Sequence, residues 1–188
     1  MPDLEGVVTT TNRLRLRVQT IEDAPFLLSL MTDPDWIRHI GDRRVRTVED
    51  VERYVLEGAI AQQAEHGCSL YLVERLSDGA PVGICGLVTR DGLEAPDLGY
   101  ALTPQHRGRG YAREATRAAL EVARDLGETR VLAVVTLDNG PSRTLLEDVG
   151  FREARIAQQD DGPVLVMGID LEDVEVPSGG EGGSGGLR

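Results

Sequence analysis

The stretch Gln105-His-Arg-Gly108-Arg-Gly110-Tyr-Ala112 lies between a predicted strand and a predicted helix. Glycine has no Cβ, so Gly108 and Gly110 allow the chain to turn tightly and to approach a ligand closely. The first backbone amides of a helix have no partner inside the helix, and together with the helix dipole they form a site for anions. Arg107 and Arg109 would add positive charge beside these amides. The stretch therefore predicts a phosphate site, with a pyrophosphate as its natural occupant.

Two other interpretations of this loop remain open at this point. The dinucleotide-binding fingerprint has a small residue where Arg113 stands, and it belongs to an early β-α repeat that this chain lacks. A glycine turn can also connect a strand to a helix without binding a ligand, and Gly-Arg-Gly alone does not distinguish these cases.

Periodicity, capping boxes and turn signals divide the rest of the chain into short elements. The predicted strands are residues 12–19, 68–74, 81–89, 97–103, 130–136, 151–157 and 164–169, and the predicted helices are residues 20–31, 47–67, 112–126 and 141–149. The order β-α-α-β-β-β-α-β-α-β-β combines hairpins with one strand–helix–strand crossover. It predicts an α/β or mixed α+β fold and not a doubly wound sheet.

The composition excludes several classes of function. The chain has 188 residues and a formal charge of −12, and all 20 of its basic residues are arginine. Without lysine there is no phosphate-binding-loop lysine, no Schiff base and no lysine general base. The acidic balance argues against general nucleic-acid binding, which requires a basic surface.

The same composition predicts a cytoplasmic protein. No apolar run approaches the roughly 18 residues of a membrane span, and the first ten residues lack the features of a secretion signal. Cys68 and Cys85 are the two cysteines, too few for a disulfide framework or a four-ligand zinc site. We expect them to be small apolar core residues, and we expect no metal site and no membrane partner.

A second motif, Asp138-Asn139-Gly-Pro-Ser142-Arg-Thr-Leu-Leu146-Glu-Asp-Val-Gly150-Phe151, follows the glycine loop. With Asp97-Leu-Gly-Tyr-Ala-Leu-Thr-Pro104 before the loop and Thr11-Asn-Arg-Leu-Arg-Leu-Arg17 near the start, it resembles the GNAT superfamily of N-acetyltransferases, in particular its RimJ/RimL-like branch. The resemblance implies one GNAT-like domain over residues 11–170, with a mostly antiparallel sheet of about seven strands flanked by about four helices. Residues 171–188 would be an acidic and then glycine-rich flexible tail.

The resemblance implies acetyl-CoA as the acetyl donor and assigns residues to it. Backbone amides of the glycine loop would hold the CoA pyrophosphate, and these belong to Arg107, Gly108, Arg109, Gly110, Tyr111 and Ala112. The end of the preceding strand would hold the pantetheine arm by main-chain bonds near Leu102 and Thr103, and Asn139 would contact the same arm.

The catalytic groups depart from the commonest pattern of the family. Many GNAT enzymes have a tyrosine acid where Leu146 stands, whereas Rim-like relatives have a serine at the position of Ser142. Ser142 would protonate the departing thiolate. A serine near the start of a helix can instead only hydrogen-bond the backbone of that helix. Asp97 is the candidate base, acting through water, or else a solvated aspartate at a strand entry. The alternative bases are Asp160 and Asp161 in the last hairpin turn, unless these two residues only form the turn with Gly162.

The amine acceptor is expected to border the loop between the first two helices. By resemblance His39 lies in the region that lines the acceptor site, and Trp36 either lines that site or packs in the core. Three arginines, Arg43, Arg44 and Arg46, either bind an acceptor carboxylate or phosphate or form a solvated surface.

The chemistry favours an α-amine. An α-amino group has a pKa of about 7.7–8.0 and a lysine-type amine about 10.4, so the α-amine is deprotonated at a smaller free-energy cost. We expect a peptide N-terminus or a small amino compound as acceptor, attacking acetyl-CoA directly in a ternary complex because no cysteine nucleophile is implied. A homodimer is expected by analogy with relatives. The alternative is a non-catalytic acyl-CoA sensor or interaction domain, which the absence of a tyrosine at Leu146 favours.

Overall fold

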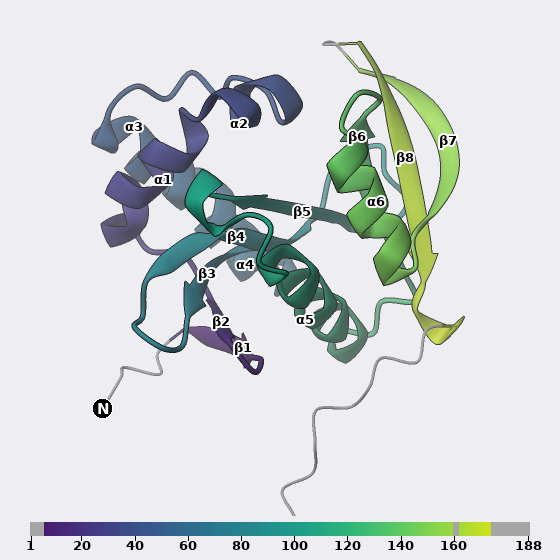
Figure 1. Cartoon of the computed structure of the whole chain (residues 1–188), viewed down its shortest axis with the longest axis horizontal. Coiled ribbons are helices and arrows are strands. Elements are labelled where there is room, and N and C mark those ends of the chain that lie inside the picture. The colour runs from purple at the N-terminus through teal and green to yellow at the C-terminus, as the bar shows by residue number, and fades with distance from the viewer. Residues whose placement is uncertain (1–5, 160–161, 174–188) are drawn as a thin grey trace, which may run out of the picture.

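The computed structural model describes residues 6–159 and 162–173. These residues form an eight-stranded sheet in the order β1-β2-β3-β4-β5-β6-β8-β7 (Figure 1). All neighbouring strands are antiparallel except β5 and β6, which are parallel. The strands are β1 (Val7–Thr10), β2 (Leu14–Arg17), β3 (Leu70–Arg75), β4 (Pro81–Val88), β5 (Asp97–Leu102), β6 (Arg130–Thr136), β7 (Arg152–Gln159) and β8 (Gly162–Asp170). The predicted mostly antiparallel α/β fold is confirmed, with β1 as an additional strand.

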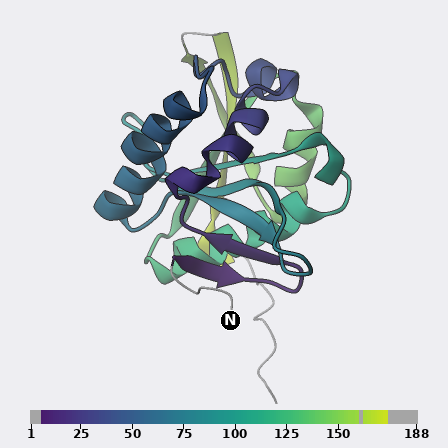
Figure 2. The same cartoon turned by 90° about the vertical axis from the view of Figure 1, so that its left-hand side faces the viewer.

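Helices cover both faces of the sheet (Figure 2). They are α1 (Ala24–Met31), α2 (Pro34–His39), α3 (Val48–Val55), α4 (Ala61–His66), α5 (Tyr111–Asp125) and α6 (Gly140–Val149). One core lies between α1, α3 and the sheet, where Leu72 and Ile84 are buried. The other lies under α5 and α6 and contains both cysteines, and burial raises the pKa of the Cys85 thiol to about 12. Cys68 and Cys85 are therefore core residues, as expected from the sequence.

Two helical segments differ from the sequence expectation. The short helix α2 lies in a stretch that was expected to be a loop; it begins with Pro34 after Asp33, whose carboxylate accepts a hydrogen bond from the N–H of Asp35. The helix predicted over 47–67 is continuous, but Leu56–Ile60 is π-helical, and Gly67 ends it with a φ of 73°. Neither feature has a strong periodic signal, because α2 and the π-helical turn are each too short to show a period of their own.

The parallel strands β5 and β6 are paired at one position, Asp97 opposite Leu132. Beyond that pair they part, and β6 continues alongside β8 from Arg130 to Thr136. β5 instead remains paired with β4 over its whole length, from Asp97 to Leu102. The two halves of the sheet are therefore joined at one end and separated at the other, as Figure 1 shows between β5 and β6.

The expected domain boundaries are only partly within the described residues. β1 lies before residue 11 and pairs with β2, while β8 ends at Asp170. Most of the predicted tail, from residue 174 onward, lies outside the described residues. Within the ranges 6–159 and 162–173, no helix is long and apolar enough to span a membrane.

Gly83 allows β4 to lie close against β5, and its replacement by alanine should destabilise the fold. A Cβ there would lie 2.1 Å from the carbonyl oxygen of Ala101, so the backbones must move apart. We expect a loss of about 1–3 kcal/mol in the free energy of unfolding, measured by urea denaturation. Gly58→Ala is the control, because a Cβ there meets nothing within 4 Å. Equal stabilities of the two variants would contradict the prediction.

Candidate active site

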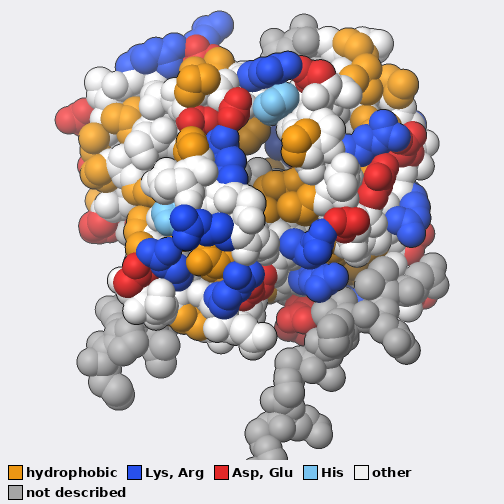
Figure 3. Space-filling model, viewed as in Figure 1, with side chains coloured by type: hydrophobic (Ala, Val, Ile, Leu, Met, Phe, Trp, Pro, Cys, Tyr) orange, Lys and Arg blue, Asp and Glu red, His pale blue; other side chains and the backbone are white. Residues whose placement is uncertain are grey.

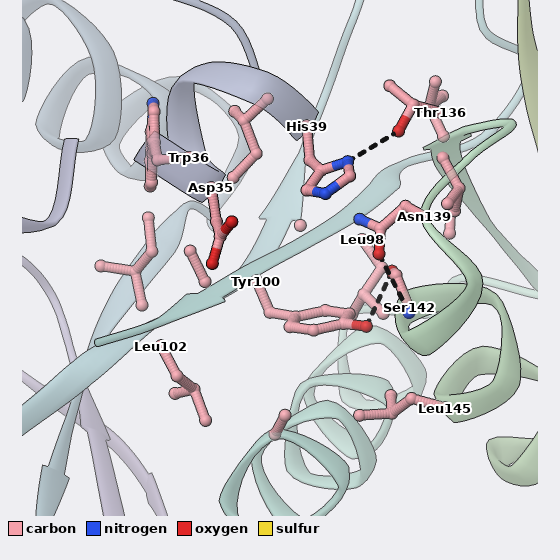
Figure 4. Close-up of a pocket in the computed structure, with 18 of the residues that line it drawn as sticks. Asp35, Trp36, His39, Leu98, Tyr100, Leu102, Thr136, Asn139, Ser142 and Leu145 are labelled. Carbon is pink, nitrogen blue, oxygen red and sulfur yellow. Dashed lines mark hydrogen bonds between the residues drawn. The ribbon is translucent and has the colours of Figure 1, made fainter. Parts of the chain in front are cut away.

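A cavity of about 1250 Å³, here called the main cavity, occupies the space where β5 and β6 part. It opens on the face of the molecule seen in Figure 3, and Figure 4 shows side chains of its lining. Its walls come from α2, β4, β5, the glycine loop, the start of α5, the end of β6 and α6. Among the residues expected from the sequence, the lining includes Trp36, His39, Asp97, Leu102, Arg107, Gly108, Gly110, Tyr111, Ala112, Asn139 and Ser142.

The edge of β5 that faces the cavity carries main-chain groups of alternate residues. The N–H of Thr103 donates to the carbonyl oxygen of Val82 on β4, at 3.0 Å. Because antiparallel pairing alternates, Tyr100 and Leu102 direct their N–H and C=O groups away from β4, toward the separated β6. Leu102 therefore directs its main-chain groups toward the cavity, and its role in holding the pantetheine arm stays a prediction. Thr103 is bonded to β4 instead and is not part of the lining.

The glycine loop adopts the conformation that its sequence indicates. Gly108 and Gly110 have φ values of 70° and 78°, in the left-handed region that favours glycine. The first bond within α5 runs from the N–H of Glu114 to the carbonyl oxygen of Gly110, so the N–H groups of residues 111–113 have no partner in the helix. These amides lie in the lining of the main cavity. Arg109 is outside that lining, and its carbonyl oxygen accepts a bond from Arg13 at 3.0 Å.

The Arg107 side chain does not supply free positive charge to the loop. Its Nε donates to the carbonyl oxygen of Leu102 at 3.0 Å, and its terminal nitrogens bond Asp33 at 3.0 Å and Asp35. The sequence expectation for this guanidinium is thus corrected, because two carboxylates of the α2 region neutralise it. Arg107 therefore adds no free charge to the main-chain amides of the loop, whereas no ion pair among the described residues neutralises Arg109.

Ser142 and Tyr100 meet across the main cavity (Figure 4). The hydroxyl oxygens of the two side chains are 2.8 Å apart, and burial raises the pKa of Tyr100 to about 12. The N–H of Ser142 donates to Oδ1 of Asn139, so Asn139 caps α6 and the Ser142 hydroxyl is directed to Tyr100 instead. Sequence analysis missed Tyr100. The signal that could have found it is a hydroxyl between Leu98 and Leu102 on the apolar face of a predicted strand.

Asp97 lies at the closed end of the main cavity, where β5 and β6 are still paired. It is 2% exposed, so it is not a solvated aspartate. Its Oδ2 is 2.7 Å from Nε of Arg90, and its Oδ1 accepts a hydrogen bond of 3.2 Å from the N–H of Val134 on β6. Burial raises the pKa of Asp97 to about 6, although the Arg90 charge opposes that effect.

The acceptor candidates lie on α2, which crosses the opening between β5 and β6. His39 Nδ1 is 3.1 Å from the hydroxyl oxygen of Thr136 at the end of β6 (Figure 4). Its neighbour Arg38 forms an ion pair with Asp138 at 2.8 Å. Trp36 is buried, and its indole N–H has no hydrogen-bond partner among the described residues. Both Trp36 and His39 line the main cavity.

The other acceptor-side candidates have different positions. Arg43 lines the main cavity, whereas Arg46 forms an ion pair with Asp42 at 2.6 Å on the surface. Arg44 is exposed and does not line the cavity. Asp160 and Asp161, the alternative bases, lie outside the described residues.

Comparison with known proteins identifies the family. The family model described as an acetyltransferase (GNAT) domain matches residues 13–152 of this chain. The chain belongs to the GNAT acetyltransferase family.

Relatives and solved structures of the GNAT family match most of the chain. The uncharacterized protein YkkB and the uncharacterized N-acetyltransferase YoaA, both of Bacillus subtilis (strain 168), are 26% identical over 162 residues and 25% identical over 154 residues. These alignments cover 83% and 81% of this chain, and 91% and 86% of the relatives. A putative GNAT-family acetyltransferase from Bordetella pertussis has a TM-score of 0.72 at 25% identity, covering 86% of this chain and 98% of that one.

Two further solved structures share the fold at lower identity. RimL, a ribosomal L7/L12 α-N-protein acetyltransferase in complex with coenzyme A, has a TM-score of 0.75 at 17% identity, with coverage of 87% of this chain and 97% of that chain. A chimera of the spermidine N-acetyltransferase SpeG from Vibrio cholerae has a TM-score of 0.71 at 18% identity, with coverage of 85% and 96%.

The buried carboxylate of Asp97 should make the stability of the fold depend on pH. The pKa of Asp97 is about 6 in the folded state and 3.8 in its ordinary state, so the folded protein binds this proton more tightly than the unfolded chain. The stabilisation that results is present at low pH, below about 4, and is lost as pH rises through about 6. Relative to Asp97→Asn, the unfolding free energy of the wild type should fall by about 2 kcal/mol between pH 4 and pH 7. Urea denaturation across this range measures the difference, and exposed Asp125→Asn is the control. A difference that rises with pH would show that burial does not raise this pKa.

Proposed function

We propose that this GNAT protein transfers an acetyl group from acetyl-CoA to an amine by direct attack in a ternary complex. The observation that carries the proposal is the main cavity, which combines unpaired main-chain groups of β5, the free amides at the start of α5 and the Ser142–Tyr100 hydroxyl pair. The fold neighbour RimL, crystallised with coenzyme A, supports the choice of cofactor.

The residues of the cavity fit coenzyme A. Its pyrophosphate would accept hydrogen bonds from the amides around Gly108, Gly110, Tyr111 and Ala112, where a Cβ on Gly108 would meet only open space. Its pantetheine arm carries amide groups, which can pair with the main-chain groups of Tyr100 and with the N–H of Leu102, whose carbonyl oxygen already accepts from Arg107. Of the residues first expected to bind it, Thr103 contributes less, since its N–H is bonded to β4, whereas the N–H of Arg109 stays a candidate donor to the pyrophosphate.

The alternation of side chains along β5 places Tyr100, the partner of Ser142, and Asp97 on opposite faces of the sheet. Tyr100 and Leu102 pack in the core under α5, whereas Ala101 packs in the core under α1. Side chains alternate along a strand, so the Cβ of Asp97 lies on the same face of the sheet as that of Ala101. We infer that the thioester is held on the α5–α6 side, beside Ser142, and that the amine approaches from the side of α1 and α2. His39 and Trp36 would line its path.

The reaction needs one proton acceptor and one proton donor. The amine nitrogen attacks the thioester carbonyl carbon, the carbon–sulfur bond breaks, and the amine loses a proton. Ser142 would donate a proton or hydrogen bond to the departing sulfur, with the Tyr100 hydroxyl replenishing it over 2.8 Å. Asp97, ionised at neutral pH, would receive the amine proton through water.

We further propose an α-amine as the acceptor and membership in the RimJ/RimL-like branch. The fold alone does not select the acceptor, because its neighbours include RimL, an α-N-protein acetyltransferase, and the spermidine N-acetyltransferase SpeG. The lower pKa of α-amines supports the choice, together with a base of modest strength at Asp97. The cytoplasmic location and the homodimer stay predictions.

Removing the Ser142 hydroxyl should slow the transfer step. We expect Ser142→Ala to lower kcat by about 100-fold or more, and Tyr100→Phe by about 10-fold, with little change in the KM for acetyl-CoA. Thiol release from acetyl-CoA with a panel of amines measures both effects. Ser77→Ala, in the exposed β3–β4 turn, is the matched control. Unchanged turnover in Ser142→Ala would remove this residue from the mechanism.

Gly108→Ala should weaken binding of CoA by about 10-fold or more, because a methyl group would enter the space assigned to the pyrophosphate and strain the loop. Gly79→Ala is a close control, since Gly79 has the same φ of 70°, also faces open space and lies in the β3–β4 turn. Calorimetric titration with CoA compares the two variants. Equal affinities would argue against a pyrophosphate at this loop.

The non-catalytic sensor is the second candidate, and Leu146 in place of a tyrosine favours it. Its signature is tight binding of acetyl-CoA without thiol release for α-amines and polyamines alike. Turnover with any amine would exclude it.

A further inference from the structure

A second cavity of about 170 Å³, here called the apolar subsite, lies between the sheet and the helices on the α1 side. It shares the side chains of Trp36, Tyr54, Leu70, Ile84 and Val88 with the main cavity. The two cavities are therefore neighbours, with these five residues lining both.

The polar residues around the apolar subsite have little hydrogen-bonding capacity to spare. Gln19 donates its side-chain N–H to the carbonyl oxygen of Leu70 at 2.7 Å. Gln62 accepts from the N–H of Thr89 at 3.2 Å and donates to the carbonyl oxygen of the same residue at 3.3 Å. Glu57, the one charged residue of this lining, is exposed. The interior therefore suits an apolar group better than a polar one.

The π-helical segment Leu56–Ile60 forms one wall of the apolar subsite. Glu57, Gly58 and Ala59 all belong to both the segment and the lining. A Cβ on Gly58 would meet no atom within 4 Å, so the space beside this glycine is empty. Helical segments of this type recur at functional sites because the extra residue in the turn reshapes the neighbouring surface.

We propose that the apolar subsite receives the side chain of the amine acceptor, so that the chain prefers α-amino compounds with an aliphatic or aromatic side chain. This inference rests on the proposed transfer to an α-amine. A cavity of about 150 Å³ with an apolar lining is large enough to bind benzene, so this one accommodates a leucine- or phenylalanine-sized group.

Amino-acid amides with the same α-amine and different side chains provide the test. Thiol release from acetyl-CoA should give a kcat/KM at least about 10-fold higher for leucinamide and phenylalaninamide than for glycinamide, with lysinamide close to glycinamide. Equal values for all four amides, or a preference for lysinamide through Glu57, would overturn the proposal.

A variant that fills the apolar subsite tests whether the preference for leucinamide arises there. Gly58→Leu should reduce the ratio of kcat/KM for leucinamide over glycinamide to about one. Ala64→Leu is the control, because it adds the same side chain to an exposed position of the following helix and should keep the wild-type ratio. An unchanged ratio in Gly58→Leu would show that the side chain binds elsewhere.

The fluorescence of Trp36 can show whether the apolar subsite is occupied, independently of whether the protein transfers an acetyl group. Trp36 is the only tryptophan of the chain and lines the apolar subsite, so its emission reports occupancy without turnover. With CoA present, leucinamide should change the emission saturably in the wild type and not in Gly58→Leu, whereas glycinamide should have little effect. If leucinamide changes the emission but no amine releases thiol from acetyl-CoA, the transferase proposal is refuted and the apolar subsite is not. Thiol release without side-chain preference or emission change would refute the apolar subsite alone.

Discussion

The parting of β5 from β6 after the single pair of Asp97 and Leu132 is the feature on which the candidate site depends. Separated strands leave main-chain N–H and C=O groups without partners, which is costly for buried groups. Side chains offset part of that cost, since the Asp97 carboxylate accepts from Val134 and Arg107 donates to the carbonyl oxygen of Leu102. The unpaired groups that remain on β5 can bind an extended ligand that carries amides.

The short helix α2 connects the two sides of this opening. Asp33 and Asp35, at its start, bind Arg107 of the glycine loop, and Arg38 near its end binds Asp138 after β6. The same contacts neutralise Arg107, so this side chain adds no free charge to the main-chain amides and the helix dipole at the loop.

Local sequence patterns predicted most of the fold and many of the residues that line the main cavity. Gly108 and Gly110 indicated the turn and the helix start because few other residues adopt their backbone conformation easily. The alternation of strands and the capping box of Thr47 and Asp50 depend on neighbours in sequence, and the structure has both. Ser142 and Asn139 were found through family motifs, and their placement at the start of α6 follows from residues within one helical turn.

By itself, the sequence determined the order of elements, the glycine loop and the candidate residues Asp97, Asn139 and Ser142, because these depend on short-range spacing. Only the tertiary structure decided that Tyr100 meets Ser142, that Thr103 is bonded to β4, that Arg107 is neutralised and that a second cavity adjoins the first. Each of these depends on strand register or on contacts between distant segments. A shift of one residue in register turns a different set of main-chain groups toward the cavity, and local spacing does not encode that choice.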